Sequence, residues 1–161
     1  MARADVRVAT KADVDEIVRI QASTWRTAYG EFIPSAALDE LTGPAARAAW
    51  TDAVAAGEGH HVLIATEGSW TVGFCAVAPA RLEDPAAPAS RAQIVTVLVE
   101  PRWGRRGHGR RLLAAAFQAA VADGATEGVV WLLERDVASR ACFDRIGWDP
   151  DGMVRGLDTG D

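Results

Sequence analysis

The stretch VLVEPRWGRRGHGRRLL, residues 97–113, joins an apolar strand-like segment to a helix-like segment through a loop rich in glycine and arginine. Its glycines, at positions 104, 107 and 109, allow positive φ values and close approach of a ligand to the backbone. The unpaired amides at a helix start, together with the helix dipole, bind anions, and nearby arginines add charge-assisted hydrogen bonds. The stretch therefore predicts a site for a pyrophosphate group.

The spacing of these glycines argues against two familiar pyrophosphate-binding loops. A P-loop requires Gly-Lys-Ser/Thr at the helix start, which this stretch lacks. A dinucleotide-binding fold has G-x-G-x-x-G early in a βαβ unit, whereas Gly104, Gly107 and Gly109 follow the reverse order late in the chain. Glu134, which ends the next strand-like segment, would serve as the ribose-binding acid in such a fold, so a dinucleotide site stays open as a weaker alternative.

The composition of the chain indicates one compact domain over residues 1–161, because a chain of this length with 49% hydrophobic residues can bury one core. The 17 Lys and Arg residues are outnumbered by 22 Asp and Glu residues, which argues against nucleic-acid binding over the whole surface. Only Trp103 accompanies the arginine cluster as a stacking aromatic, so a nucleic-acid module is the weakest alternative.

The cysteines and the apolar runs give no sign of a metal site or of a membrane segment. Cys75 and Cys142 lie far apart, without a C-x-x-C motif or a His-Cys cluster, so we expect buried, reduced thiols and no metal. The start, MARADVRVAT, is charged, and no run approaches the roughly 18 apolar residues that a membrane helix needs. We therefore expect a cytoplasmic protein with no membrane partner.

The hydrophobic periodicity predicts an α/β fold with a mixed central sheet and flanking helices. Thr10 and Asp13 are predicted to cap a first helix, which residues 23–34 are expected to interrupt. The apolar face of that helix comprises Val14, Ile17, Val18 and Trp25. The other predicted helices are residues 34–41, residues 44–56, a helix that ends before Gly124, and residues 138–146. The apolar face of the helix before Gly124 comprises Leu112, Leu113, Ala116, Phe117, Ala120 and Val121. The predicted strands are residues 5–10, a hairpin over 61–78, 93–101 and 128–134, and residues 148–155 are predicted to form a last turn or strand.

Three segments resemble motifs of the GCN5-related N-acetyltransferase (GNAT) family, whose members transfer acetyl from acetyl-CoA to amines. VLVEPRWGRRGHGRRLL resembles the family's acetyl-CoA motif, in which a strand ending V-x-P leads into Q/R-x-x-G-x-G/A and a helix with paired leucines. LLERDVASRACFDRIGW, residues 132–148, resembles L-x-E-x-N-x-x-A-x-x-x-Y-x-x-x-G-F/W. STWRTAYGEFIP, residues 23–34, resembles the acceptor loop of a bacterial branch of the family. The resemblance spans nearly the whole chain and implies the GNAT fold.

The resemblance implies an acetyl-CoA site on the strand and loop of the first motif. Backbone amides from Arg105 to Arg110 would surround the pyrophosphate, while Arg102 or Arg111 would reach the 3′-phosphate. The strand backbone would pair with the pantetheine arm, and one of its amides would polarise the thioester carbonyl. We expect the His108 side chain at the surface, pointing away from this loop. The implied cofactor residues are Val97, Leu98, Val99, Arg105, Arg106, Gly107, His108, Gly109, Arg110 and Asp136, the last standing where the family has Asn.

The implied chemistry is direct attack of an amine, from a small molecule or a peptide, on the thioester. Trp25, Tyr29 and Phe32 are predicted to line the acceptor pocket, with the protein core as the alternative for these aromatics. Gln93 stands on the strand where related sequences can carry glutamate, so Glu134, which matches the glutamate of the second motif, is the candidate base. The alternative for Glu134 is a solvated carboxylate at the end of a strand. Phe143 replaces the tyrosine thought to protonate the CoA thiolate. A non-catalytic or weakly active acyl-CoA-binding domain is therefore the alternative function.

The end of the chain departs from the family pattern. GNAT proteins usually finish with a hairpin whose last strand lies beside the fifth strand, but nothing apolar remains after WDPDGMVRGLDTGD, residues 148–161, to supply it. We expect this last strand to be missing or supplied by a partner, and the open edge to be covered by residues 152–157 or by a second subunit in a homodimer.

Overall fold

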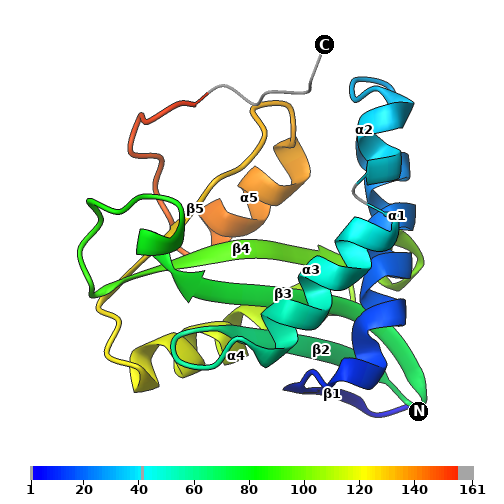
Figure 1. Cartoon of the computed structure of the whole chain (residues 1–161), viewed down its shortest axis with the longest axis horizontal. Coiled ribbons are helices and arrows are strands. Elements are labelled where there is room, and N and C mark those ends of the chain that lie inside the picture. The colour runs from blue at the N-terminus through cyan, green and yellow to red at the C-terminus, as the bar shows by residue number, and fades with distance from the viewer. Residues whose placement is uncertain (1, 41, 156–161) are drawn as a thin grey trace.

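The computed structural model describes residues 2–40 and 42–155, which form one five-stranded sheet with helices on both faces (Figure 1). The strands lie in the order β1-β2-β3-β4-β5, with β5 parallel to β4 and the other neighbours antiparallel. Their bounds are β1 Ala4–Val8, β2 His61–Glu67, β3 Trp70–Pro79, β4 Arg91–Val99 and β5 Glu127–Val130. The predicted mixed α/β sheet is confirmed.

Two groups of helices cover the two faces of this sheet (Figure 1). On one face, α1 and α3 bury side chains such as Ile17 and Ile20 against Ile64 and Phe74. On the other face, α4 and α5 pack around Cys75. The helix bounds are α1 Val14–Tyr29, α2 Ser35–Glu40, α3 Pro44–Ala55, α4 His108–Ala122 and α5 Val137–Arg145.

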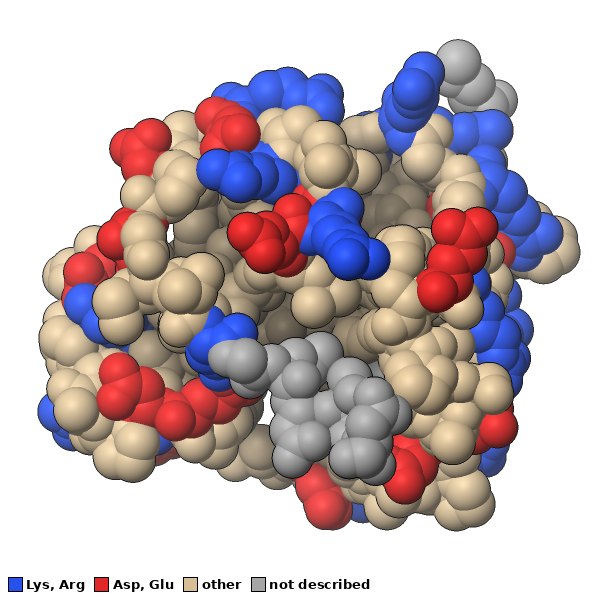
Figure 2. All heavy atoms as spheres, turned by 90° about the horizontal axis from the view of Figure 1, so that it is seen from above, with Lys and Arg blue, Asp and Glu red and all other residues tan. Residues whose placement is uncertain are grey.

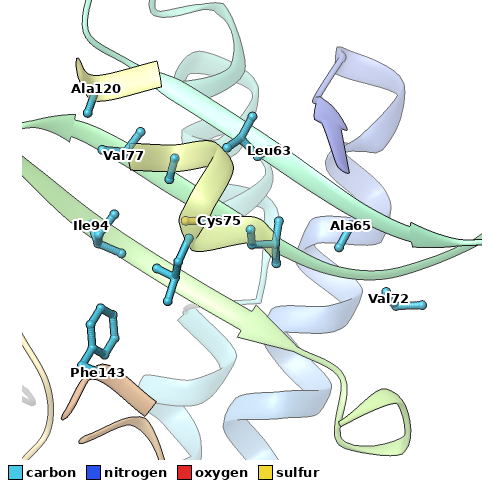
Figure 3. Packing of buried hydrophobic residues seen from close by; sticks show 11 residues of the cluster. Leu63, Ala65, Val72, Cys75, Val77, Ile94, Ala120 and Phe143 are labelled. Atoms are coloured by element: carbon cyan, nitrogen blue, oxygen red, sulfur yellow. The ribbon is translucent and has the colours of Figure 1, made fainter. Parts of the chain in front are cut away.

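The core on the α4 side is built from small and medium apolar side chains with one aromatic ring (Figure 3). Ile94 from β4 and Phe143 from α5 lie on the same side of this cluster, and Cys75 lies near its centre (Figure 3). Complete burial raises the pKa of the Cys75 thiol to about 12, so this cysteine stays a neutral core residue. Cys142 is also a free thiol, as predicted, but it is half-buried rather than buried.

Several local predictions agree with the structure. Asp13 and Thr10 form the predicted capping box before α1. The hairpin of β2 and β3 turns at Gly68, whose φ of 60° is a conformation that glycine adopts at little cost. The helix α4 ends before Gly124, which has a φ of 95°.

Other predictions are wrong at the level of the element. The helix α1 continues through the segment expected to interrupt it and ends at Tyr29, because no glycine or proline occurs there before Gly30. Val121 was expected on the apolar face of α4 but is 67% exposed, since Ala120 takes the buried position. Residues 148–155 form neither a helix nor a strand.

Candidate active site

The strands β4 and β5 pair over four positions only, from Arg91 with Glu127 to Ile94 with Val130. Beyond Ile94, the rest of β4 has no partner on β5 among the described residues, so the two strands diverge and leave an opening between them. The half of β4 that pairs with β3 but not with β5 contains the predicted pantetheine residues Val97, Leu98 and Val99. The opening leaves that edge of β4 free to pair with an extended ligand.

A β-bulge interrupts β4 where the divergence starts. Ala76 of β3 pairs with Thr96, but the next residue, Val77, pairs with Ile94, so Val95 is an extra residue without a counterpart. The bulge changes which side chains face α4: Ile94 does so before it, and Val97 and Val99 do so after it. Bulges of this kind often occur next to active sites, where they bend the strand and change the direction of its side chains. The bulge therefore leaves Val95 out of the pairing with β3 at the point where β4 and β5 diverge.

The loop between β4 and α4 presents the start of α4 without a side-chain cap. Gly107 is the N-cap residue, with a φ of 83°, and no side chain of its own or of a neighbour accepts from the first helical amides. Arg105 also has a positive φ, 62°, which is uncommon for a residue with a side chain. The Arg111 side chain donates to the Arg106 carbonyl at 3.1 Å and closes the loop. The first amides of α4 are thus free to bind an anion.

The loop arginines divide into two groups. Arg102 forms an ion pair with Glu100 at 2.8 Å, and Arg106 forms one with Glu67 at 2.7 Å, so two acidic residues hold these side chains. Glu100 is almost fully buried and also binds Arg19 of α1, at 2.6 Å. Arg105, Arg110 and Arg111 form no ion pair with any residue that the structure describes, and they remain the cations available to a phosphate.

The His108 side chain is not at the surface, and the prediction of an exposed imidazole is wrong. His108 is 2% exposed, and its Nε2 lies 2.8 Å from Oε2 of Glu67. The first residue of α4 faces the sheet rather than the solvent, and the carboxylate at the end of β2 gives the buried ring a polar partner. The imidazole thus ties the start of α4 to the end of β2.

Asp136 and Tyr29, predicted for the cofactor site and the acceptor site, bond directly to each other. The Tyr29 hydroxyl donates to Oδ2 of Asp136 at 2.5 Å, and the Ser139 amide and hydroxyl donate to the same carboxylate. Burial, and then the bond to Asp136, raise the pKa of Tyr29. Burial works to raise the pKa of Asp136, but the bonds from Tyr29 and Ser139 outweigh it and lower that pKa. This carboxylate caps α5 and ties it to α1.

The aromatic side chains predicted for the acceptor pocket form a cluster at the end of α1. The rings of Trp25 and Tyr29 lie 5.0 Å apart edge to face, and those of Tyr29 and Phe32 lie 6.1 Å apart. Phe32 is 44% exposed with the Arg135 guanidinium over its ring, and the Trp25 indole N–H is buried without a hydrogen-bond partner. The cluster therefore belongs partly to the surface, unlike a core cluster.

The candidate catalytic groups differ in their surroundings. Glu134 follows β5 in an exposed turn and forms no ion pair with a described residue. The segment from Trp131 to Glu134 was predicted to continue the strand, but it leaves the sheet where pairing with β4 ends. Phe143 is 3% exposed and packs edge to face on Trp148 at 5.1 Å. Tyr29 is the chain's one tyrosine, so it supplies the only phenol near these elements.

The surface seen from the β5 side of the sheet is hollowed, and acidic and basic side chains surround the hollow (Figure 2). A separate cavity of about 400 Å³ lies between the end of α4 and the start of β5, lined by residues such as Phe117, Ala120 and Trp148, and it contains no predicted site residue. Within residues 2–40 and 42–155, no cluster of His, Cys, Asp or Glu is arranged to hold a metal ion. None of the described helices is long and apolar enough to span a membrane.

Comparisons with known proteins agree with this geometry. The family described as the acetyltransferase (GNAT) family matches residues 16–148. The uncharacterized N-acetyltransferase YuaI of Bacillus subtilis is 30% identical over 132 residues, which cover 81% of this chain and 72% of YuaI.

Two solved structures share the fold at low sequence identity. The PaiA N-acetyltransferase of Thermoplasma acidophilum, in complex with coenzyme A, has a TM-score of 0.77 at 14% identity and covers 93% of this chain and 94% of its own. The structure of yncA from Salmonella typhimurium, with its cofactor acetyl-CoA, has a TM-score of 0.70 at 23% identity and covers 89% of this chain and 78% of its own. The chain therefore belongs to the GNAT family of acetyltransferases, which use acetyl-CoA as co-substrate.

Proposed function

We propose that this protein transfers the acetyl group of acetyl-CoA to an amine by direct attack of the amine on the thioester. The observation that carries this proposal is the opening between β4 and β5, with the bulge at Val95 at its start and the uncapped end of α4 beside it. An extended strand edge next to an anion site matches a ligand that has a peptide-like arm ending in a pyrophosphate. Coenzyme A has both parts.

In the proposed complex, the backbone of Val97, Leu98 and Val99 pairs with the pantetheine arm. The amides from Arg105 through Gly107, His108 and Gly109 to Arg110 surround the pyrophosphate, with the free Arg105 and Arg110 guanidiniums on its rim. The backbone amide at the bulge points toward the thioester carbonyl and stabilises the oxyanion that forms after attack. Asp136 closes the end of the opening next to the arm.

The reaction needs a neutral amine and a way for the thiolate to leave. The amine nitrogen attacks the thioester carbon, the carbon–sulfur bond breaks, and the nitrogen loses a proton, which we assign to Glu134 directly or through water. Trp25, Tyr29 and Phe32 line the acceptor side. A general acid contributes about 10²- to 10⁴-fold, but a thiol of pKa near ~8.5 leaves without one, and orientation alone contributes roughly 7 to 11 kcal/mol.

The proposal is tested by thermal melting and by a turnover assay against a broad panel of amines. Acetyl-CoA at one hundred times its dissociation constant adds about 2.7 kcal/mol to the free energy of unfolding. Arg110→Glu, which puts a carboxylate at the anion site, weakens that effect, whereas Arg145→Glu, at an exposed arginine that bonds only to its own helix, leaves it unchanged. A melting curve that shifts with NADH and not with acetyl-CoA contradicts the assignment.

The non-catalytic alternative has its own signature in the same assay. Stabilisation by acetyl-CoA without acetylation of any amine would identify an acyl-CoA-binding domain, in line with Phe143 at the place of the tyrosine and Gln93 at the place of the glutamate.

A further inference from the structure

The C-terminal segment carries an arginine that lies against two residues from other parts of the fold. The Arg155 guanidinium binds the Glu83 carboxylate at 2.7 Å, and its carbon lies 4.4 Å from the centre of the Trp131 ring. Glu83 belongs to the loop between β3 and β4, and Trp131 directly follows β5. Figure 1 shows the C-terminal segment, in red, beside that green loop.

Glu83 and Trp131 lie close to the point where β4 and β5 stop pairing. Val130 packs into the cluster on the α4 side and Gly128 lies against Trp148, so Val129, the alternate residue of β5, points to the other face. Trp131 follows directly where the chain leaves the sheet. Gln93, the β4 partner of Val129, is 5% exposed, and its side chain contributes, after Arg155, to lowering the pKa of the Glu83 carboxylate. The carboxylate and the indole thus lie at the start of the opening between β4 and β5.

A carboxylate beside the face of a tryptophan is a receptor for a cation. The carboxylate accepts charge-assisted hydrogen bonds, and the indole face attracts the same positive charge. Arg155 meets both requirements in the free protein, but the ion pair is exposed, 49% at Arg155 and 37% at Glu83. Exposed ion pairs contribute little to stability, so a cation from solution can replace the guanidinium.

We propose that Glu83 and Trp131 form a subsite for a second positive group on the acceptor amine, and that Arg155 fills this subsite until the acceptor binds. The inference rests on the proposed acetyl transfer and narrows its substrate class to compounds with two cationic nitrogens, such as diamines. One amine reaches the thioester, and the other stays protonated against the Glu83 carboxylate. Arg155 then acts as an internal competitor that lowers the apparent affinity for the acceptor.

The test compares cadaverine with pentylamine, two amines with the same carbon chain, binding to the CoA-bound protein in isothermal titration calorimetry. We expect wild-type protein to bind cadaverine about tenfold more tightly than pentylamine, the effect of one charge-assisted contact. Glu83→Gln and Trp131→Leu reduce this preference, and Arg155→Ala increases the affinity for cadaverine alone. Arg145→Ala, at an exposed arginine that bonds only to its own helix, is the matched control.

The outcomes separate this inference from the proposed function. Equal binding of cadaverine by folded Glu83→Gln and wild-type protein overturns the subsite, as does a lack of cadaverine binding by both wild type and Arg155→Ala. If binding depends on Glu83 but no amine is acetylated in the turnover assay, the subsite stands and the proposed transfer fails. If pentylamine is acetylated as efficiently as cadaverine by every variant, the transfer stands and the subsite fails.

Discussion

Glu67 joins the end of β2 to the loop between β4 and α4, the proposed cofactor loop, through two contacts. One carboxylate oxygen binds Arg106 and the other binds the buried His108 ring. The hydrogen bond to His108 lowers the pKa of Glu67, burial opposes it, and the Arg106 charge adds to the lowering, so the carboxylate is ionised at neutral pH. Glu67 therefore fixes the side chains of two residues of the loop, Arg106 and His108.

We predict that Glu67→Gln weakens acetyl-CoA binding without changing the chemical step. The amide keeps the size of the side chain but loses the charge that holds Arg106, so the loop samples other conformations. The KM for acetyl-CoA should rise by about threefold to tenfold, while kcat changes little, as expected when a positioning contact is lost. Steady-state kinetics measures both constants. Glu58→Gln, at an exposed turn before β2, is the control, and an equal effect in that variant contradicts the role of Glu67.

Asp13 gives a second prediction at the scale of one residue, through the dependence of stability on pH. Its carboxylate accepts two bonds from Arg7, each 2.8 Å long, and one from the Thr10 amide. Arg7 is the largest cause of a pKa lowered from 3.8 to about 2, burial opposes it, and the Thr10 amide adds to it. Because the folded pKa lies below the unfolded one, Asp13 stabilises the fold above the unfolded value, and this stabilisation is lost as pH falls toward about 2.

The measurement is urea denaturation of Asp13→Asn and wild type at several pH values. The variant should lose roughly 1 to 2 kcal/mol of unfolding free energy at neutral pH and much less near the folded pKa, where the wild-type carboxylate is protonated as well. A difference between the two proteins that stays constant across this range would mean that the Arg7 contact does not carry the stabilisation.

At the scale of elements, the sequence pattern predicts which segments are strands and helices, but not where pairing ends. The run from Val129 to Leu133 is apolar throughout and is typical of a buried strand, yet β5 stops at Val130. Its end depends on β4, which diverges after the bulge at Val95. No glycine or proline marks that bulge in the sequence, so strict alternation assigns the later residues of β4 to the wrong face.

The packing of α5 leads to a prediction for Phe143→Tyr. The ring is buried among apolar side chains and packs on Trp148, so an added hydroxyl would be desolvated without a known partner. We expect a loss of roughly 1 to 3 kcal/mol of unfolding free energy and no gain in turnover. Thermal melting and the acetyl-transfer assay are run on the same preparation. Faster turnover at an unchanged melting temperature would instead mean that the ring edge faces the thioester and that a phenol there restores the missing acid.

At the scale of the whole molecule, the site joins residues that are far apart in the chain. Tyr29 reaches Asp136, and Arg19 reaches Glu100, across 107 and 81 positions of sequence. Motif spacing predicts a cofactor site in the loop between β4 and α4 because the residues of that motif are consecutive. It did not predict Glu67 or Glu100 as anchors, since contacts between distant segments have no local pattern. The aromatic cluster was predicted from a motif, but its bond to α5 was not.

The free edge of β5 leads to the last prediction. In the part of the chain that the structure describes, Glu127–Val130 pair only with β4, and residues 152–155 are exposed and form no strand; residues 156 and 157 of the expected covering segment lie outside it. Trp148 packs against Gly128 on the α4 face, where an added Cβ would come within 2.9 Å of the indole, but this covers a face and not the edge. Unpaired strand edges are rarely left bare, so we expect a second chain to cover this one.

Light scattering at micromolar concentration should therefore give twice the mass of one chain, and hydrogen exchange should be slow along Val129 and Val130. Dilution below the dimer dissociation constant should lower the mass to that of one chain and make the exchange fast at the same concentration, because the same contact causes both effects. A monomeric mass with slow exchange would mean that the chain covers its own edge, and a monomeric mass with fast exchange would mean that the edge is open. Either result contradicts the dimer, and only the second leaves β5 free to pair with a partner of another kind.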